Sequence, residues 1–322
     1  SYAVFCSKKK IPSMSLCVPC SALASMNSSG VSPCLCISAA ASTIVARSSL
    51  NTANPSLNSV DCSATFAGVS SDGQKQMNVT PFAADGSVDL KRAAELATRL
   101  VDDGNDGLVV SGTTGEAPTT HRQEKADLLR AVVEAVGDRA HVVAGAGSND
   151  TTHAIGMAQD AAKAGADGLL LVTPYYNKPP QAGVIAHVTA VVESTDLPVM
   201  LYDIPGRAGI AMTTDTIVRL AEHDRVVAMK DAKHDLEASS WVLSRSDIAY
   251  YSGDDAWTLP LLAIGGVGVV GTSTHLVAAR TQQLIEAFFA GDLAKARALH
   301  SALLPIYSGI FRAPGTILVK AA

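Results

Sequence analysis

The chain lacks several features that would assign it to other classes of protein. None of its apolar runs approaches the roughly 20 residues that a membrane-spanning helix needs. All six cysteines lie at or before Cys62, so the remainder of the 322-residue chain has no means of forming a disulfide. The net charge of −5 offers no positive surplus for nucleic acid or an anionic membrane. We therefore expect a soluble enzyme without nucleic-acid or membrane partners.

Metal ligands at recognisable spacing are also scarce. The two cysteine pairs at 17–20 and 34–36 could be half-sites for zinc, but no histidine precedes His121. The cysteine-free part of the chain shows no cluster of His, Asp and Glu at metal-ligand spacing. We therefore expect no bound metal.

Residues 1–75 differ in composition from the rest. They are rich in Ser and Ala, and up to residue 70 the only acidic residue is Asp61, against four basic ones, Lys8, Lys9, Lys10 and Arg47. A Ser-rich, acid-poor segment of this kind is typical of an organelle transit peptide, and a disordered extension is the alternative. A transit peptide would imply the plastid stroma, and a plain extension the cytoplasm.

From residue 76 onward, short apolar runs alternate with amphipathic segments of helical length. Runs such as LVV and VMLY are apolar at successive positions, which is typical of parallel strands covered on both faces. The strand candidates are 78–82, 107–111, 141–146, 168–173, 199–204, 226–230, 248–252 and 268–272. Helical patterns recur between them, for example at 90–100, 123–136, 154–164 and 284–290. The pattern predicts an α/β fold, a (β/α)8 barrel over 76–291, followed by a helical region at 292–322.

Active sites of such barrels lie at the carboxyl ends of the strands, where this sequence places one lysine. Lys230 follows the apolar run 226–229. Lysine is seldom buried without a reason, and desolvation lowers its pKa, which frees the amine as a nucleophile toward a ketone. The alternative is a strand-end lysine paired with Asp231 or Asp203, and the lysine alone leaves both interpretations open.

Neighbouring strand ends carry groups that suit such a lysine. Tyr202 could pass protons or simply cap the barrel. Thr113 and Thr114 lie in a glycine-flanked turn that could hold a carboxylate or could be an ordinary loop. Arg207 could bind a second carboxylate or lie on the surface. For the turn at 253–255 we favour a structural role, with its aspartates at a helix N-terminus.

Six motifs along the chain together resemble the dihydrodipicolinate synthase / N-acetylneuraminate lyase family. They are VTPF (79–82), GTTGE (112–116), VTPYYNKP (172–179), LYDIPGR (201–207), MKDAK (229–233) and YSGDD (251–255). Their order and spacing match that family from 79 to 299. The paired threonines, Tyr176 and Arg207 resemble its synthase branch. This resemblance implies condensation of pyruvate with aspartate semialdehyde in lysine biosynthesis, through the diaminopimelate route.

The resemblance also implies a role for each site residue. The catalytic group is Lys230, which forms an imine with pyruvate, and the proton relay of Thr113, Tyr176 and Tyr202. The substrate-binding group is Thr114, Arg207, Gly253 and Val270. In the family the relay tyrosine reaches a neighbouring subunit, which implies a homo-oligomer, a dimer or a tetramer. Apart from the covalent imine, no cofactor is implied.

Some features depart from the family pattern. Members of the family continue for several dozen residues, so we expect the C-terminal helical extension to be truncated here at Ala322. Arg122 and Lys125 stand where lysine-sensitive members carry histidines, which predicts weak or no inhibition by lysine. Two alternatives stay open: another pyruvate-dependent lyase of the family, either a 2-keto-3-deoxy-acid aldolase or an N-acetylneuraminate lyase, and a non-catalytic fragment.

Overall fold

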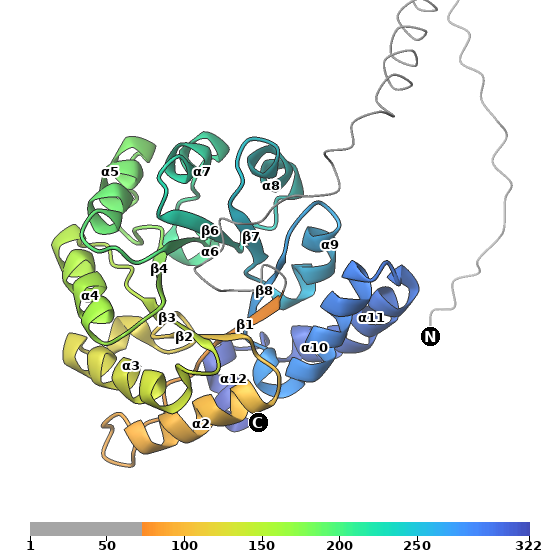
Figure 1. The fold of residues 1–322 in the computed structure, drawn as a ribbon, viewed down its shortest axis with the longest axis horizontal. Coiled ribbons are helices and arrows are strands. Elements are labelled where there is room, and N and C mark those ends of the chain that lie inside the picture. Colours follow the sequence, from red (N-terminus) through yellow and green to blue (C-terminus); the bar gives the residue numbers. More distant parts are fainter. Residues whose placement is uncertain (1–72) are drawn as a thin grey trace, which may run out of the picture. The chain divides into compact units, whose positions relative to one another are not determined.

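Eight parallel strands close into a barrel in the computed structural model, which describes residues 73–322 (Figure 1). Each strand pairs with the next one along the chain, and β8 pairs with β1. The strands are β1 (Gly73–Met77), β2 (Gly107–Val110), β3 (His141–Gly145), β4 (Gly168–Val172), β5 (Val199–Asp203), β6 (Val226–Asp231), β7 (Ala249–Ser252) and β8 (Gly268–Gly271). The predicted barrel is confirmed. Of the segment 1–75 that we expect to be a transit peptide or a disordered extension, residues 1–72 lie outside the described residues, and residues 73–75 belong to β1.

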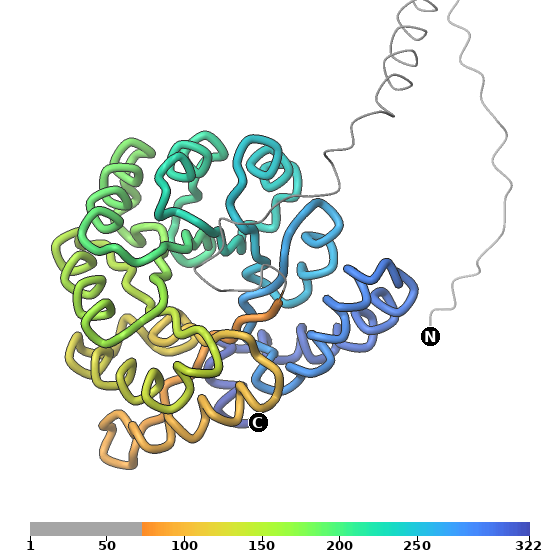
Figure 2. The backbone as a smooth tube through the Cα atoms, in the orientation of Figure 1, coloured from red at the N-terminus to blue at the C-terminus, as the bar shows by residue number. Residues whose placement is uncertain are grey.

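Helices alternate with these strands and surround the barrel, as the backbone trace also shows (Figure 2). The longer ones are α2 (Leu90–Asp102), α3 (Arg122–Val136), α4 (Thr151–Lys163), α5 (Gln181–Val192), α7 (Thr214–Ala221), α8 (Leu236–Leu243), α9 (Thr258–Leu262) and α10 (Thr274–Phe289). Short turns of helix are η2 (Ala117–Thr119), α6 (Pro205–Ala208) and η3 (Asp255–Trp257). The predicted C-terminal helical region contains α11 (Leu293–Gly309) and α12 (Gly315–Ala321). Within 73–322, no helix has both the length and the apolar character to cross a membrane.

The first strand is the one that the sequence misplaces. Seven strands start and end within one residue of their predicted limits, but β1 is Gly73–Met77 and not 78–82. The predicted start of the barrel at 76 is therefore too late. The error has a physical cause, because β1 is polar and yet fully buried. Gln74 faces the helices, where its amide donates hydrogen bonds to the carbonyls of Gly104 and Ala278, both at 3.0 Å.

The alternate residues of β1 point into the barrel. Met77 belongs to an apolar interior cluster that also contains Val109, Val143, Leu170, Met200, Tyr202, Ala228, Tyr251 and Val270. Lys75 lies among these residues with no exposed surface, and its Nζ is 4.9 Å from the centroid of the Tyr251 ring. Burial lowers the pKa of Lys75 to about 8, and the charge of Asp106 opposes the shift. Within residues 73–322, the Lys75 Nζ in the barrel core has no hydrogen-bond acceptor.

Candidate active site

Lys230 and Tyr202 lie side by side at the mouth of the barrel. Each is the penultimate residue of its strand, β6 or β5, and the two are paired in register. In a strand, successive side chains point to opposite faces, so both of these point inward. The Lys230 Nζ lies 4.3 Å from the centroid of the Tyr202 ring, and each residue is 3% exposed.

This burial sets the protonation of both groups. It lowers the pKa of Lys230 to about 7, against the opposing charges of Asp255 and Asp254. It raises the pKa of Tyr202 to about 12, which a side-chain hydrogen bond with Thr113 and the charge of Arg207 oppose. Near pH 7 about half of the lysine is therefore present as the neutral amine, while the phenol keeps its proton.

The threonine turn follows β2 and is held from two sides. Thr114 is 7% exposed, and its Oγ1 lies 3.3 Å from that of Thr272, which follows β8. From α12, Thr316 Oγ1 donates a hydrogen bond of 3.0 Å to the Thr114 carbonyl, and the Lys320 Nζ contacts Glu116 Oε1 at 2.5 Å. The C-terminal helix therefore supports the turn that we predict to bind a carboxylate.

A cavity of about 290 Å³ opens beside the tyrosine. Thr113, Tyr202 and Arg207 line it, with Arg207 exposed on the short helix α6. It extends toward Lys125 and His153. Lys230 does not line this cavity, but it adjoins the Tyr202 ring, which does.

Five of the eight predicted residues do not line this cavity, namely Lys230, Thr114, Gly253, Val270 and Tyr176. Gly253 lies after β7, where its N–H donates to the Asp231 carbonyl at 2.7 Å; a Cβ there would lie 2.9 Å from the same oxygen, so a side chain is excluded. Val270 is fully buried in the barrel interior. Tyr176 is 84% exposed, with a left-handed φ of 70°, and projects from the chain. A single chain therefore does not bring Tyr176 to the lysine.

The two aspartates at 254–255 have the structural roles that we favoured. Asp254 caps η3 by accepting a hydrogen bond from the Ala256 N–H, at 2.9 Å. Asp255 is 2% exposed and accepts hydrogen bonds from the backbone N–H groups of Thr272 and Ser273. Sequence reasoning overlooked Lys233, Thr316 and Lys320, because their partners become visible only in three dimensions.

Among residues 73–322, no group of three or more His, Cys, Asp and Glu side chains is arranged to hold a metal ion. The groups that the fold does bring together are an amine, a phenol, hydroxyls and a guanidinium. Such groups suit covalent catalysis through an amine, with proton transfer by the hydroxyls.

A buried lysine at the carboxyl end of a parallel barrel strand, beside a tyrosine and a threonine turn, defines a class of (β/α)8-barrel enzymes. Comparison with known proteins identifies the family within that class. The chain belongs to the dihydrodipicolinate synthetase family, whose model matches residues 71–322.

Several relatives cover most of the barrel. The 4-hydroxy-tetrahydrodipicolinate synthase of Acidothermus cellulolyticus is 66% identical over 244 residues, which are 76% of this chain and 79% of that protein. The 4-hydroxy-tetrahydrodipicolinate synthase 2 of Streptomyces coelicolor is 58% identical, over 76% of this chain and 82% of its own length. Among solved structures, a DHDPS from Cyanidioschyzon merolae with lysine bound superposes with a TM-score of 0.76 at 42% identity, covering 78% of this chain and 86% of that one.

The lowered pKa of Lys230 predicts how the reactivity of this amine depends on pH. If Lys230 forms the pyruvate imine that the family resemblance implies, the rate of adduct formation should fall about tenfold for each pH unit below about 7, because only the neutral amine attacks the ketone. Borohydride trapping of the adduct over a pH series measures this rate. A rate that stays constant down to about pH 5 would contradict the assignment, since pyruvate itself does not titrate in that range.

Proposed function

We propose that this chain acts as a 4-hydroxy-tetrahydrodipicolinate synthase, which condenses pyruvate with aspartate semialdehyde in lysine biosynthesis. The observation that carries the proposal is the buried Lys230 amine, with a pKa of about 7, 4.3 Å from the Tyr202 ring. Relatives of this name at 66% and 58% identity support it.

In the proposed mechanism, the neutral amine of Lys230 attacks the keto carbon of pyruvate and forms a carbinolamine. Loss of water then gives an imine, in which the positive nitrogen withdraws electrons from the pyruvate methyl group. The methyl group loses a proton to give an enamine, and this carbon attacks the aldehyde. Tyr202 and Thr113, whose side chains line the same cavity, carry the protons between these steps.

The remaining residues bind the substrates. Thr114 and the backbone amides of its turn hold the pyruvate carboxylate, and Gly253 and Val270 form the deeper part of that subsite. Arg207, exposed at the cavity, binds the carboxylate of the aldehyde substrate. These steps use only side chains and the covalent imine, so we propose that the reaction needs neither a metal nor an organic cofactor.

A panel of aldehydes, offered together with pyruvate, tests the substrate assignment. We expect aspartate semialdehyde to be preferred and an Arg207→Ala variant to raise its KM by about tenfold to a hundredfold, from the loss of a charge-assisted contact. The pyruvate adduct should still form, because Arg207 is proposed to contact only the aldehyde substrate. Preference for a sugar-derived aldehyde would overturn the proposal in favour of another lyase of the family.

We further propose that the chain works as a homo-oligomer in which Tyr176 enters the site of the neighbouring subunit. An 84% exposed tyrosine, held in a left-handed conformation by its own loop, supports this, since neither exposure nor strain benefits the single chain.

A Tyr176→Phe variant should therefore lose about a hundredfold in kcat, the usual contribution of one general acid–base group. Mixing it with a Lys230→Ala variant is the decisive measurement. In mixed oligomers, the Lys230 of one subunit meets the intact Tyr176 of the other, so activity should reappear. If the mixture stays as inactive as its parts although subunits exchange, Tyr176 acts within its own chain or not at all.

A further inference from the structure

A pair of buried carboxylates lies directly behind the catalytic pair. Asp203 follows Tyr202 on β5, Asp231 follows Lys230 on β6, and the two aspartates are paired in register. Because side chains alternate along a strand, these two point away from the barrel interior, toward the surrounding helices. Asp203 has no exposed surface and Asp231 is 6% exposed.

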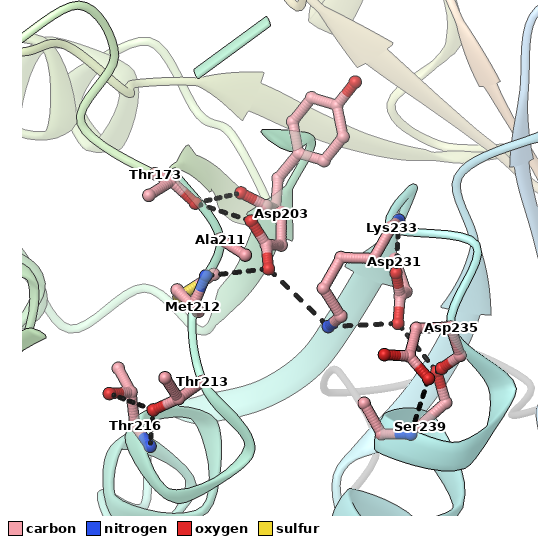
Figure 3. Close-up of polar contacts among 12 residues, drawn as sticks. Thr173, Asp203, Ala211, Met212, Thr213, Thr216, Asp231, Lys233, Asp235 and Ser239 are labelled. Atoms are coloured by element: carbon pink, nitrogen blue, oxygen red, sulfur yellow. Dashed lines mark hydrogen bonds and ion pairs between the residues drawn. The ribbon is translucent and has the colours of Figure 1, made fainter. Parts of the chain in front are cut away.

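Lys233 connects the two carboxylates. Its Nζ lies 3.6 Å from Asp203 Oδ2 and 3.2 Å from Asp231 Oδ2, and its side chain is only 7% exposed (Figure 3). The loop after β6 folds back to allow this, and the Lys233 N–H donates to Asp231 Oδ1 at 2.7 Å. A single ammonium thus links the ends of the two strands that carry Tyr202 and Lys230.

Neutral donors complete the shell around each aspartate. Asp231 accepts hydrogen bonds from Ser239 Oγ at 2.8 Å and from the Tyr250 hydroxyl at 2.6 Å. Asp203 accepts one from the Met212 N–H at 2.9 Å and one from Thr173 Oγ1 at 3.2 Å (Figure 3). Each carboxylate is therefore well bonded, whereas the Lys233 Nζ lies at ion-pair distance from both and makes no hydrogen bond within residues 73–322. With both carboxylates ionised, this one cation faces two anions.

The surplus negative charge affects both the cluster and the catalytic tyrosine. Burial raises the pKa of Asp203 to about 6, and Lys233 is the strongest influence that opposes the shift. The charge of Asp203 in turn raises the pKa of Tyr202. The ionisable groups that face Asp203 are Lys233 from the loop, Asp231 from β6 and Tyr250 from β7.

We propose that Lys233 is a positioning residue for the reaction, which keeps the Asp203–Asp231 pair ionised and so holds the strand ends bearing Tyr202 and Lys230 in place. Without the ammonium, two adjoining buried carboxylates cannot both stay ionised near neutral pH, and one takes up a proton. The partly protonated carboxylate pair then has no ion pair with the side chain at position 233 in the loop after β6. This inference rests on the function proposed above.

The test compares the pH dependence of kcat/KM in four proteins: the wild type, Lys233→Met, Asp203→Asn and the double variant. In Lys233→Met the acid limb of the kcat/KM profile should move up by about one pH unit. The value of kcat/KM should then be about tenfold lower than in the wild type near pH 7 and nearly equal to it at about pH 9. In the Asp203→Asn background, the same Lys233→Met change should leave the limb where it was, because no carboxylate pair remains to share a proton.

Lys233→Arg is the matched control, since it keeps the charge and should keep the wild-type limb. It also provides the test if Lys233→Met does not fold: an Arg variant with the limb displaced upward would overturn the proposal. So would a Lys233→Met loss that is uniform across pH, or a limb shift that persists in the Asp203→Asn background. Failure of the proposed function is distinguished separately, because wild-type protein would then form no pyruvate adduct at any pH.

Discussion

Replacing Lys230 with alanine should reduce kcat by on the order of a thousandfold or more and abolish the trapped pyruvate adduct. The amine is the only group proposed to form a covalent bond with the substrate, and without it neither the imine nor the enamine can form. Its burial beside Tyr202 also makes it the neutral amine that attack requires near pH 7. The measurements are turnover with pyruvate and aspartate semialdehyde, and borohydride trapping followed by peptide mapping.

Within the described part of the chain, three lysines have buried side chains, which makes the mapping informative. Lys75 is fully buried in the barrel, and Lys233 is paired with two aspartates, so a reactive lysine cannot be identified by burial alone. The adduct should map to Lys230 in the wild type and should persist in a Lys75→Met variant. An adduct on Lys230→Ala protein, or a kcat within tenfold of the wild type, would mean that another amine does the chemistry.

The sequence predicts most of the barrel because its buried parallel strands are apolar at successive positions. In β5 and β6 this pattern also locates the strand ends, and the order of strands in a barrel then makes Tyr202 and Lys230 neighbours. The pairing of these two residues in register confirms that inference. The sequence also predicts the direction of the pKa shift of Lys230, but neither its size nor the distance between the two side chains, because both depend on how completely the surrounding side chains exclude water.

The features that the sequence could not predict are those whose partners lie far along the chain. The polar strand β1 resembles a loop until Gln74 is seen to bond with Gly104 and with Ala278, which is 204 residues away. Lys233 resembles a surface lysine until Asp203 of the preceding strand is placed beside it. For Tyr176 the sequence gives a role only through the family resemblance, and the single chain, in which this residue is 84% exposed, does not place it at the lysine.

Replacing Lys75 with methionine should stabilise the protein by about 3 kcal/mol near pH 7. The estimate follows from the pKa of Lys75, lowered from 10.5 to about 8. A group whose pKa is lower in the folded state binds fewer protons there than in the unfolded chain. Its cost to folding is complete below about pH 8, declines as the pH rises and vanishes above about 10.5. Methionine has nearly the same length, fills the same space and carries no charge.

The dependence on pH separates this explanation from an ordinary gain in packing. Urea unfolding of wild type and Lys75→Met should show a difference in the free energy of unfolding that is largest at or below pH 8 and smaller by about pH 10. Lys91→Met is the control, because its side chain is 87% exposed and its loss should change stability little at any pH. If this difference in the free energy of unfolding stays constant from about pH 7 to 10, the added stability comes from packing. A destabilised variant would mean that the contact between Lys75 and the Tyr251 ring outweighs the cost of burying the charge.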